Sequence, residues 1–214
     1  MAPLAKICGL SQADDARVAA ENGADFLGFI HFEKSPRHVS LGAASLLGKA
    51  LPAGPSRVGV MVDADDDTIE AFADHLALTH IQLHGRETVD RAAAIKALTG
   101  LKLIKVIKVA EREDISQADA FADIADMLLF DTKPLPSDTL PGGNARSFPW
   151  HYLAERIFAV PALVAGGLTP ENVGEALAQS KVSGVDVSSG VESAPGVKSH
   201  DKIKAFLKAT KAAS

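Results

Sequence analysis

The sequence predicts an α/β fold, a single (β/α)8 barrel of the TIM type that spans residues 1–214. Short runs rich in β-forming residues alternate with longer amphipathic segments along the whole chain. Connections of that length join parallel strands. Eight such units in about 200 residues are typical of a closed barrel. No Gly/Ser linker, low-complexity tract or charge run divides the series, so we expect one domain.

The elements follow from the alternation of these segments. We expect strands at 5–8, 26–31, 57–62, 80–84, 102–109, 127–131, 161–165 and 185–188. We expect helices at 12–22, 65–75, 87–98, 149–156, 170–179 and 198–209. Ser11 is a candidate N-cap for the first of them, and Thr169-Pro170-Glu171 places a cap residue before a proline at the first helical position. An open, doubly wound sheet is the alternative arrangement.

Polar residues inside the strands favour the barrel over the open sheet, whose central strands are apolar on both faces. In the strand at 80–84, alternation puts Gln82 and His84 on one face and the apolar residues on the other. We therefore expect Gln82 and His84 to point into the barrel and its mouth. By the same rule Lys6 shares a face with Cys8, and Asp186 with Ser188. The first and last strands of a closed barrel are neighbours, so we hypothesise a Lys6–Asp186 pair inside it.

Composition excludes several classes of partner. The formal charge of −5 gives no basic footprint for nucleic acid or anionic lipid. No apolar run approaches the roughly 20 residues that span a bilayer, and the N-terminal segment lacks a signal-peptide pattern. A lone cysteine excludes an internal disulfide framework and fits a reducing compartment. We expect a cytoplasmic monomer that binds neither nucleic acid nor membrane.

The chemistry of such barrels lies at the C-terminal ends of the strands. The residues expected there are Cys8, His31, Asp63, His84, Asp131, Gly166 and Ser188. They bring thiol, imidazole and carboxylate groups to one rim. An isolated intracellular cysteine is more often a small buried hydrophobe, but Cys8 ends the first strand, where its sulfur can face a pocket.

Two glycine-containing loops suit a phosphate. Ala165-Gly166-Gly167-Leu168 ends the seventh strand, and Ser188-Ser189-Gly190-Val191 ends the eighth and can open a short helix. Glycines let an anion approach backbone amides, and phosphate sites of this fold frequently lie in these two loops. In the loop at 31–38, Arg37 can bind a carboxylate through two parallel hydrogen bonds, although a solvated basic loop is the alternative.

Several segments together resemble the phosphoribosylanthranilate isomerase family, in the family's order and from the first strand to the last helix. They are Lys6-Ile7-Cys8-Gly9-Leu10, Lys34-Ser35-Pro36-Arg37, Gln82-Leu83-His84-Gly85, Leu129-Phe130-Asp131-Thr132, Ala165-Gly166-Gly167-Leu168, Gly184-Val185-Asp186-Val187-Ser188-Ser189-Gly190-Val191-Glu192 and Pro195-Gly196-Val197-Lys198.

The resemblance implies an enzyme of tryptophan biosynthesis that needs no metal or organic cofactor. Its substrate is the small phosphorylated molecule N-(5-phosphoribosyl)anthranilate, which undergoes an Amadori rearrangement. By position in the motifs, Asp131 carries over as the general acid and Cys8 as the general base. Arg37 carries over as the contact to the anthranilate carboxylate. The amides near Gly166, Gly167, Ser189 and Gly190 carry over as the phosphate cradle, with Ser188, Gln82 and His84 as further substrate-binding candidates.

The surroundings of the two reacting groups lead to an expectation for their pKa values. Four apolar residues precede Asp131, so desolvation is expected to push its carboxyl toward the neutral form. A thiol ionises more readily beside a cation, and Lys6 is the local candidate beside Cys8.

Two departures from the family pattern fall in loops. Asn144-Ala145-Arg146-Ser147-Phe148-Pro149-Trp150 places a proline where the family has an acid, which affects the loop after the sixth strand. Ile30-His31-Phe32-Glu33 stands where the family often has aromatics and a proline. Neither departure removes the assigned acid or base.

Other functions remain open at this point. A metal-dependent sugar-phosphate epimerase would use His31, Asp63, His84 and Asp131 as ligands. A two-carboxylate isomerase of histidine biosynthesis would need an aspartate in place of Cys8. A barrel that only binds a phosphorylated ligand would show no turnover, so an assay of substrate loss separates it from an enzyme.

Overall fold

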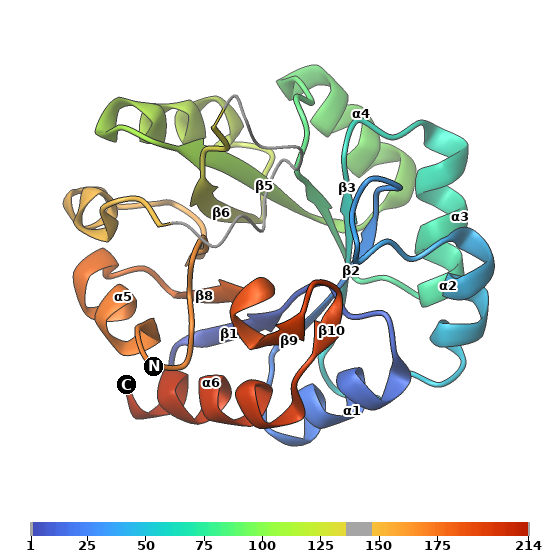
Figure 1. The fold of residues 1–214 in the computed structure, drawn as a ribbon. Helices are drawn as coiled ribbons and strands as arrows, with labels where there is room; N and C mark the ends of the chain where they lie inside the picture. The colour runs from blue at the N-terminus through green and yellow to red at the C-terminus, as the bar shows by residue number, and fades with distance from the viewer. Residues whose placement is uncertain (1, 136–146, 214) are drawn as a thin grey trace.

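The computed structural model describes residues 2–135 and 147–213. Eight parallel strands close into a barrel in chain order, and the eighth pairs back with the first (Figure 1). The strands are β1 (Leu4–Ile7), β2 (Phe26–His31), β3 (Ser56–Met61), β4 (His80–Leu83), β5 (Lys102–Val109), β6 (Met127–Thr132), β7 (Ala162–Val164) and β8 (Gly184–Val187). Closure confirms the predicted barrel and excludes the open sheet. Each strand lies within two residues of its predicted bounds.

Helices surround the barrel (Figure 1). The α-helices are α1 (Ala13–Glu21), α2 (Leu41–Gly48), α3 (Asp66–Leu76), α4 (Val89–Thr99), α5 (Val173–Ser180) and α6 (His200–Ala212). The 3-10 helices are η1 (Arg112–Phe121), η2 (Trp150–Glu155) and η3 (Ser189–Val191). A small antiparallel hairpin, β9 (Glu192–Ala194) and β10 (Val197–Lys198), follows η3.

Several helix predictions need correction. Helices α2 and η1 were not expected, and the segment expected as a helix at 149–156 is the 3-10 helix η2, with Pro149 at its N-cap position. Ser11 does not cap α1; Gln12 occupies that position without a side-chain cap bond. Thr169 lies in a turn that precedes α5, whose N-cap position is Asn172. The amide of Asn172 bonds to the carbonyl of Thr169 in that turn.

The core has two layers. A large cluster fills the space between the barrel and its helices. A smaller cluster lies inside the barrel and is built from Phe26, Val58, Ile104, Val106, Met127, Leu129, Leu163 and Ala165. Because this apolar cluster fills the barrel interior, the polar groups of a site lie at the C-terminal ends of the strands. No helix of the described residues is both long and apolar enough to cross a membrane.

Candidate active site

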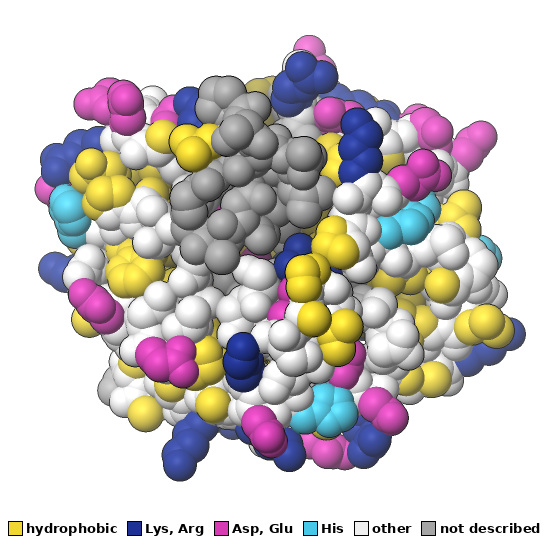
Figure 2. Space-filling model, in the orientation of Figure 1, with side chains coloured by type: hydrophobic (Ala, Val, Ile, Leu, Met, Phe, Trp, Pro, Cys, Tyr) yellow, Lys and Arg dark blue, Asp and Glu magenta, His cyan; other side chains and the backbone are white. Residues whose placement is uncertain are grey.

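The C-terminal ends of the strands surround a cleft that opens to solvent. The lining includes all ten residues predicted for the site: Cys8, Arg37, Gln82, His84, Asp131, Gly166, Gly167, Ser188, Ser189 and Gly190. Figure 2 shows basic and acidic side chains inside an opening near the middle of this face. His31 and Asp63, also expected at the rim, do not line the cleft.

Cys8 follows β1 and is almost fully buried at one side of the cleft. Below it, the Lys6 Nζ lies 2.9 Å from the Asp186 Oδ1, which confirms the predicted pair across β1 and β8. Gly28 of β2 makes room for both groups. A Cβ at that position would lie 2.9 Å from the Cys8 Sγ and 3.1 Å from the Lys6 Nζ.

Burial raises the pKa of the Cys8 thiol, although the Lys6 charge works to lower it. The expectation that Lys6 favours the thiolate therefore needs correction. Lys6 has the predicted sign of effect, but Asp186 pairs with Lys6 and itself raises the pKa of Cys8. In this structure the thiol is the favoured form.

Asp131 of β6 lies on another side of the cleft, and a cation and an imidazole approach its carboxylate. The Lys108 Nζ is 3.1 Å from the Asp131 Oδ2, and the His84 Nε2 is 3.4 Å from the same oxygen. The Asp131 Oδ1 accepts a hydrogen bond of 2.9 Å from the Thr132 amide. The side chains of Asp131 and His84 are 8 % and 13 % exposed, so these contacts act with little solvent screening.

The pKa of Asp131 is lowered, not raised. Burial does work to raise it and is the largest single influence, but Lys108 and His84 together outweigh burial. The prediction that desolvation keeps this carboxyl neutral is wrong for the ligand-free site. Its carboxylate is the favoured form, because Lys108 supplies a cation that the local sequence around Asp131 does not contain.

His84 connects Asp131 to β4. The Gln82 Nε2 lies 3.1 Å from the His84 Nδ1, and the His84 Nε2 contacts Lys108. Burial first, and the Lys108 charge second, lower the pKa of His84. The prediction that Gln82 and His84 point into the barrel mouth is confirmed, since both line the cleft.

Sequence reasoning missed Lys108. Period-two alternation along β5 was the available signal, because Ile104 and Val106 point into the barrel and Lys108 is the next residue on that face.

Arg37 reaches the cleft from the loop after β2 and is 5 % exposed. Its Nε and Nη2 lie 2.6 and 2.8 Å from the two carboxylate oxygens of Glu192, the first residue of β9. The predicted solvated alternative for this loop therefore does not hold for Arg37. Glu192 is the last residue of the family-like motif at 184–192, but no role was predicted for it from the sequence.

The two glycine loops meet at the far end of the cleft. Gly166 and Gly167 adopt positive φ angles of 84° and 65°, which favour glycine. A Cβ on Gly190 would lie 1.8 Å from the Leu168 carbonyl oxygen, so only glycine permits this contact between the loops. Within residues 2–135 and 147–213, the amides of Gly166, Gly167, Ser189 and Gly190 donate no hydrogen bond to the protein.

The four candidate metal ligands do not form one site. His31 bonds through its Nδ1 to the Val39 carbonyl, and Asp63 accepts from the Arg86 amide. Among the residues that the structure describes, no group of three or more His, Cys, Asp or Glu side chains is arranged to hold a metal ion. The ligand set of the epimerase alternative is thus not assembled.

The two departures from the family pattern lie in different places. Residues 144–146 fall outside the described residues, whereas Phe148 and Trp150 are buried in the core. In the other departure, Ile30 and Phe32 line the cleft.

Comparisons with known proteins agree with this geometry. The model of the family described as N-(5'phosphoribosyl)anthranilate (PRA) isomerase matches residues 5–209. Two curated relatives bear the name N-(5'-phosphoribosyl)anthranilate isomerase. That from Paracoccus denitrificans is 48% identical over 207 residues, 97% of this chain and 96% of the relative. That from Azorhizobium caulinodans is 49% identical over 213 residues, 100% of this chain and 93% of the relative.

Solved structures extend the likeness to the fold. A phosphoribosyl anthranilate isomerase from Thermotoga maritima superposes with a TM-score of 0.87 at 34% identity, covering 98% of this chain and 99% of that one. A phosphoribosyl anthranilate isomerase in complex with reduced 1-(o-carboxyphenylamino)-1-deoxyribulose 5-phosphate superposes with a TM-score of 0.83 at 32% identity. This match also covers 98% of this chain and 99% of that one.

Proposed function

The chain belongs to the N-(5'-phosphoribosyl)anthranilate isomerase family, and on that premise we propose that it converts N-(5-phosphoribosyl)anthranilate to 1-(2-carboxyphenylamino)-1-deoxyribulose 5-phosphate by an Amadori rearrangement. The observation that carries this proposal is one cleft onto which a thiol, a carboxyl group, an arginine and two loops of bare amides all open. A relative's structure contains the reduced form of this product.

The proposed reaction separates proton donation from proton removal. Asp131 donates a proton to the ribose ring oxygen, the bond from C1 to that oxygen breaks, and the nitrogen lone pair forms a Schiff base. Cys8 then removes the C2 proton, and the electrons of that C–H bond reduce the iminium to an enolamine. Tautomerisation of the enolamine gives the ketone. Hydrogen moves within one molecule without net oxidation, so the chemistry requires no electron carrier.

Binding follows the charges of the substrate. The phosphate is assigned to the amides of Gly166, Gly167, Ser189 and Gly190, which point to no protein acceptor in the described ranges. The carboxylate of the anthranilate ring is assigned to Arg37 at the mouth. Gln82 and His84 remain candidates for contacts to the ribose hydroxyls between these ends.

The protonation states of the free site set a condition on this mechanism. The proposed chemistry needs a neutral Asp131 and a Cys8 thiolate, whereas the ligand-free site favours the carboxylate and the thiol. The state with a neutral Asp131 and a Cys8 thiolate carries the same net charge as the state with an Asp131 carboxylate and a Cys8 thiol. The two states differ only in which of the two groups holds the single proton. We therefore assign activity to the minor form of this singly protonated pair.

Substitution of the two groups tests the proposal. Each positioned acid or base contributes about 10² to 10⁴ in rate. Cys8→Ala and Asp131→Asn are each expected to lower turnover by at least that range, measured as the loss of substrate fluorescence, with a cooperative thermal transition as the control for folding. Wild-type protein that binds the substrate without consuming it would indicate a binding barrel instead. Near-wild-type turnover in either variant would retire the role assigned to that residue.

We further propose that the chain acts as a monomer. Among the residues that the structure describes, the exposed large hydrophobic side chains are spread over five segments: Leu46 on α2, Val89 and Leu98 at the two ends of α4, Leu135 after β6, Ile157 after η2 and Val197 on β10. Scattered apolar residues are normal on a monomer surface. A relative from Thermotoga maritima is described as dimeric. Light scattering coupled to gel filtration is expected to give the mass of one 22.3 kDa chain, and twice that mass would overturn the proposal.

A further inference from the structure

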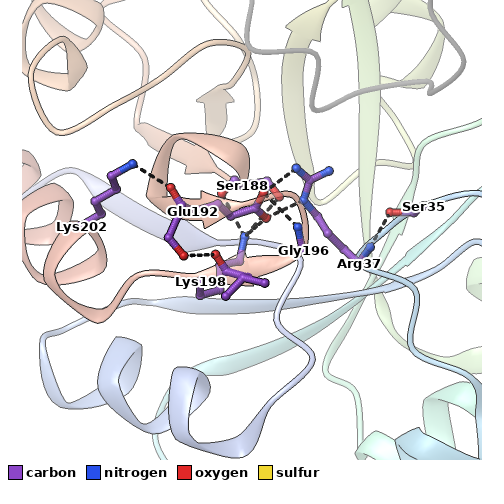
Figure 3. Close-up of polar contacts among 9 residues, drawn as sticks. Ser35, Arg37, Ser188, Glu192, Gly196, Lys198 and Lys202 are labelled. Atoms are coloured by element: carbon purple, nitrogen blue, oxygen red, sulfur yellow. Dashed lines mark hydrogen bonds and ion pairs between the residues drawn. The ribbon is translucent and has the colours of Figure 1, made fainter.

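Arg37 and the loop before η3 are joined by a buried ionic network that the proposed chemistry does not use. Glu192 occupies its centre, between the Arg37 guanidinium and the Lys198 ammonium (Figure 3). The Lys198 Nζ lies 2.9 Å from the Glu192 Oε1. The Arg37, Glu192 and Lys198 side chains are 6 %, 5 % and 1 % exposed. We call these three residues the Glu192 network.

The Glu192 carboxylate determines which nitrogens of Arg37 remain available. It accepts from Nε and Nη2 along one edge of the planar guanidinium. Nη1 makes no hydrogen bond within the described ranges, and Arg37 itself lines the cleft. The guanidinium is therefore held along one edge, and its other donors have no partner among the residues that the structure describes.

The carboxylate is in turn held from its other side. The Gly196 amide donates to the Glu192 Oε2 at 3.3 Å. Lys198 also donates to the Ser188 carbonyl at 2.9 Å, so the network extends to the residue that precedes the proposed phosphate amides. Burial works to raise the pKa of Glu192, but Arg37 and Lys198 lower it, so the carboxylate stays ionised.

The charges of the network leave one positive charge in excess, because two cations share one anion. A buried cation without a full counter-charge favours an anionic ligand. Fixing a guanidinium before binding also removes the entropic cost of ordering its side chain.

We propose that Glu192 is a positioning residue for substrate binding, which holds Arg37 with its free N–H groups toward the cleft so that they meet the ring carboxylate of the substrate. This assignment rests on the proposed function. It adds a selectivity determinant outside the reacting pair. The Glu192 carboxylate bonds to Arg37, Lys198 and the Gly196 amide, and only the Glu192 main chain contacts the amide loop, at the Ser189 carbonyl. Loss of the carboxylate is therefore expected to weaken recognition of the substrate carboxylate and to spare recognition of the phosphate.

Two probes separate these effects: the reduced product analogue that a relative binds, and the same molecule without its ring carboxylate. Calorimetric titration of Glu192→Gln is expected to show affinity for the carboxylated probe falling about 10- to 100-fold, the range for a charged hydrogen-bond pair. Affinity for the carboxyl-free probe is expected to change by no more than about twofold. In an Arg37→Met background, Glu192→Gln is expected to add no further loss.

Lys202→Met supplies the matched control. Lys202 donates to the Glu192 main-chain carbonyl at 2.7 Å and does not touch its carboxylate. The substitution Lys202→Met removes a lysine contact that α6 makes to the same hairpin, and it is expected to leave both affinities unchanged. If Glu192→Gln does not fold, Glu192→Asp keeps the charge but shortens the side chain, and is expected to show the same selective loss at smaller size.

Equal losses for the two probes, no loss for either, or a wild-type protein without preference for the carboxylated probe would each overturn the positioning role. These titrations read binding alone. Failure of the proposed function shows separately, as wild-type protein that does not consume phosphoribosylanthranilate.

Discussion

Lys6, which is buried, and Lys108, which is partly buried, each lie beside one of the two reacting groups, and they leave those groups in different protonation states. Lys6 pairs with Asp186 while it faces Cys8, and the pKa of Cys8 stays raised. Lys108 forms its ion pair with Asp131 itself, and the pKa of Asp131 is lowered. Burial acts on both groups in the same direction, upward. The difference lies in the counter-charge of each lysine.

The comparison shows that a nearby cation is not sufficient to ionise a buried group. Asp186 already balances Lys6, so little net positive charge remains for Cys8, and desolvation decides. The consequence for activity is a wide pH plateau. The singly protonated pair persists between the lowered pKa of Asp131 and the raised pKa of Cys8, and the active minor form is a constant fraction of it. Substitution of either lysine, or of the counter-charge of Lys6, therefore tests this difference, and a rim carboxylate away from both lysines serves as a control.

Removing Lys6 is expected to have the largest effect. Lys6→Met leaves Asp186 buried without its partner, and breaking a buried pair in this way costs about 3–5 kcal/mol of unfolding free energy. Urea denaturation measures the change. The double variant Lys6→Met/Asp186→Leu is the control, because it replaces both charges with apolar groups and is expected to recover most of the loss. A single variant as stable as wild type would contradict the buried-pair assignment.

Removing Lys108 is expected to move the acid limb of the kcat/KM profile to higher pH. Lys108 lowers the pKa of Asp131, so Lys108→Met raises that pKa. Below it the pair becomes doubly protonated, and activity relative to the variant's own plateau falls about tenfold per pH unit. Lys108→Arg keeps the charge and is the matched control. An acid limb that does not move in Lys108→Met would mean that Lys108 does not set the ionisation of Asp131.

Removing the counter-charge of Lys6 is expected to act on the alkaline limb. Asp186 raises the pKa of Cys8, so Asp186→Asn lowers it and frees the Lys6 charge for the thiolate. The plateau of kcat/KM against pH is then expected to end at a lower pH than in wild type. Since Cys8 is the only cysteine, its alkylation by iodoacetamide reports the thiolate directly, and at pH 7 the rate is expected to rise by up to about tenfold per unit of pKa. A slower rate would reverse the sign of the Asp186 effect.

A rim carboxylate outside the cleft is expected to have the smallest effect. Asp63 accepts from the Arg86 amide and does not line the cleft. Asp63→Asn should change turnover by less than about twofold, as surface substitutions usually do. This variant is the matched control for Asp131→Asn, since both remove one carboxylate from a loop or strand end on the same face. A large loss of turnover would return Asp63 to the list of candidate site residues.

Much of the fold and the site could be predicted from the sequence, because both depend on short-range periodicity. Alternation in β4 placed Gln82 and His84 correctly, and strand adjacency in a closed barrel predicted the Lys6–Asp186 pair. Helix α2 was missed, since Leu41–Gly48 is largely apolar and has no amphipathic stripe.

The remaining features depend on contacts between distant parts of the chain. Arg37 and Glu192 are separated by 155 residues, and nothing in either segment specifies the other. The error on Asp131 has the same origin, because its flanking apolar residues predict desolvation while Lys108 arrives from a neighbouring strand. Local sequence therefore predicted where the reacting groups lie better than how they ionise.

Cys8 and Asp131 are assigned to different steps on one substrate. Kinetic isotope effects on kcat/KM with substrate deuterated at C2, measured for Cys8→Ser and Asp131→Asn, test this directly. In Cys8→Ser, removal of the C2 proton is expected to limit the rate, so the isotope effect should exceed that of wild type. In Asp131→Asn, ring opening is expected to limit the rate, so the isotope effect should fall toward one. The reverse pattern, or the same change in both variants, would contradict the assignment of base and acid.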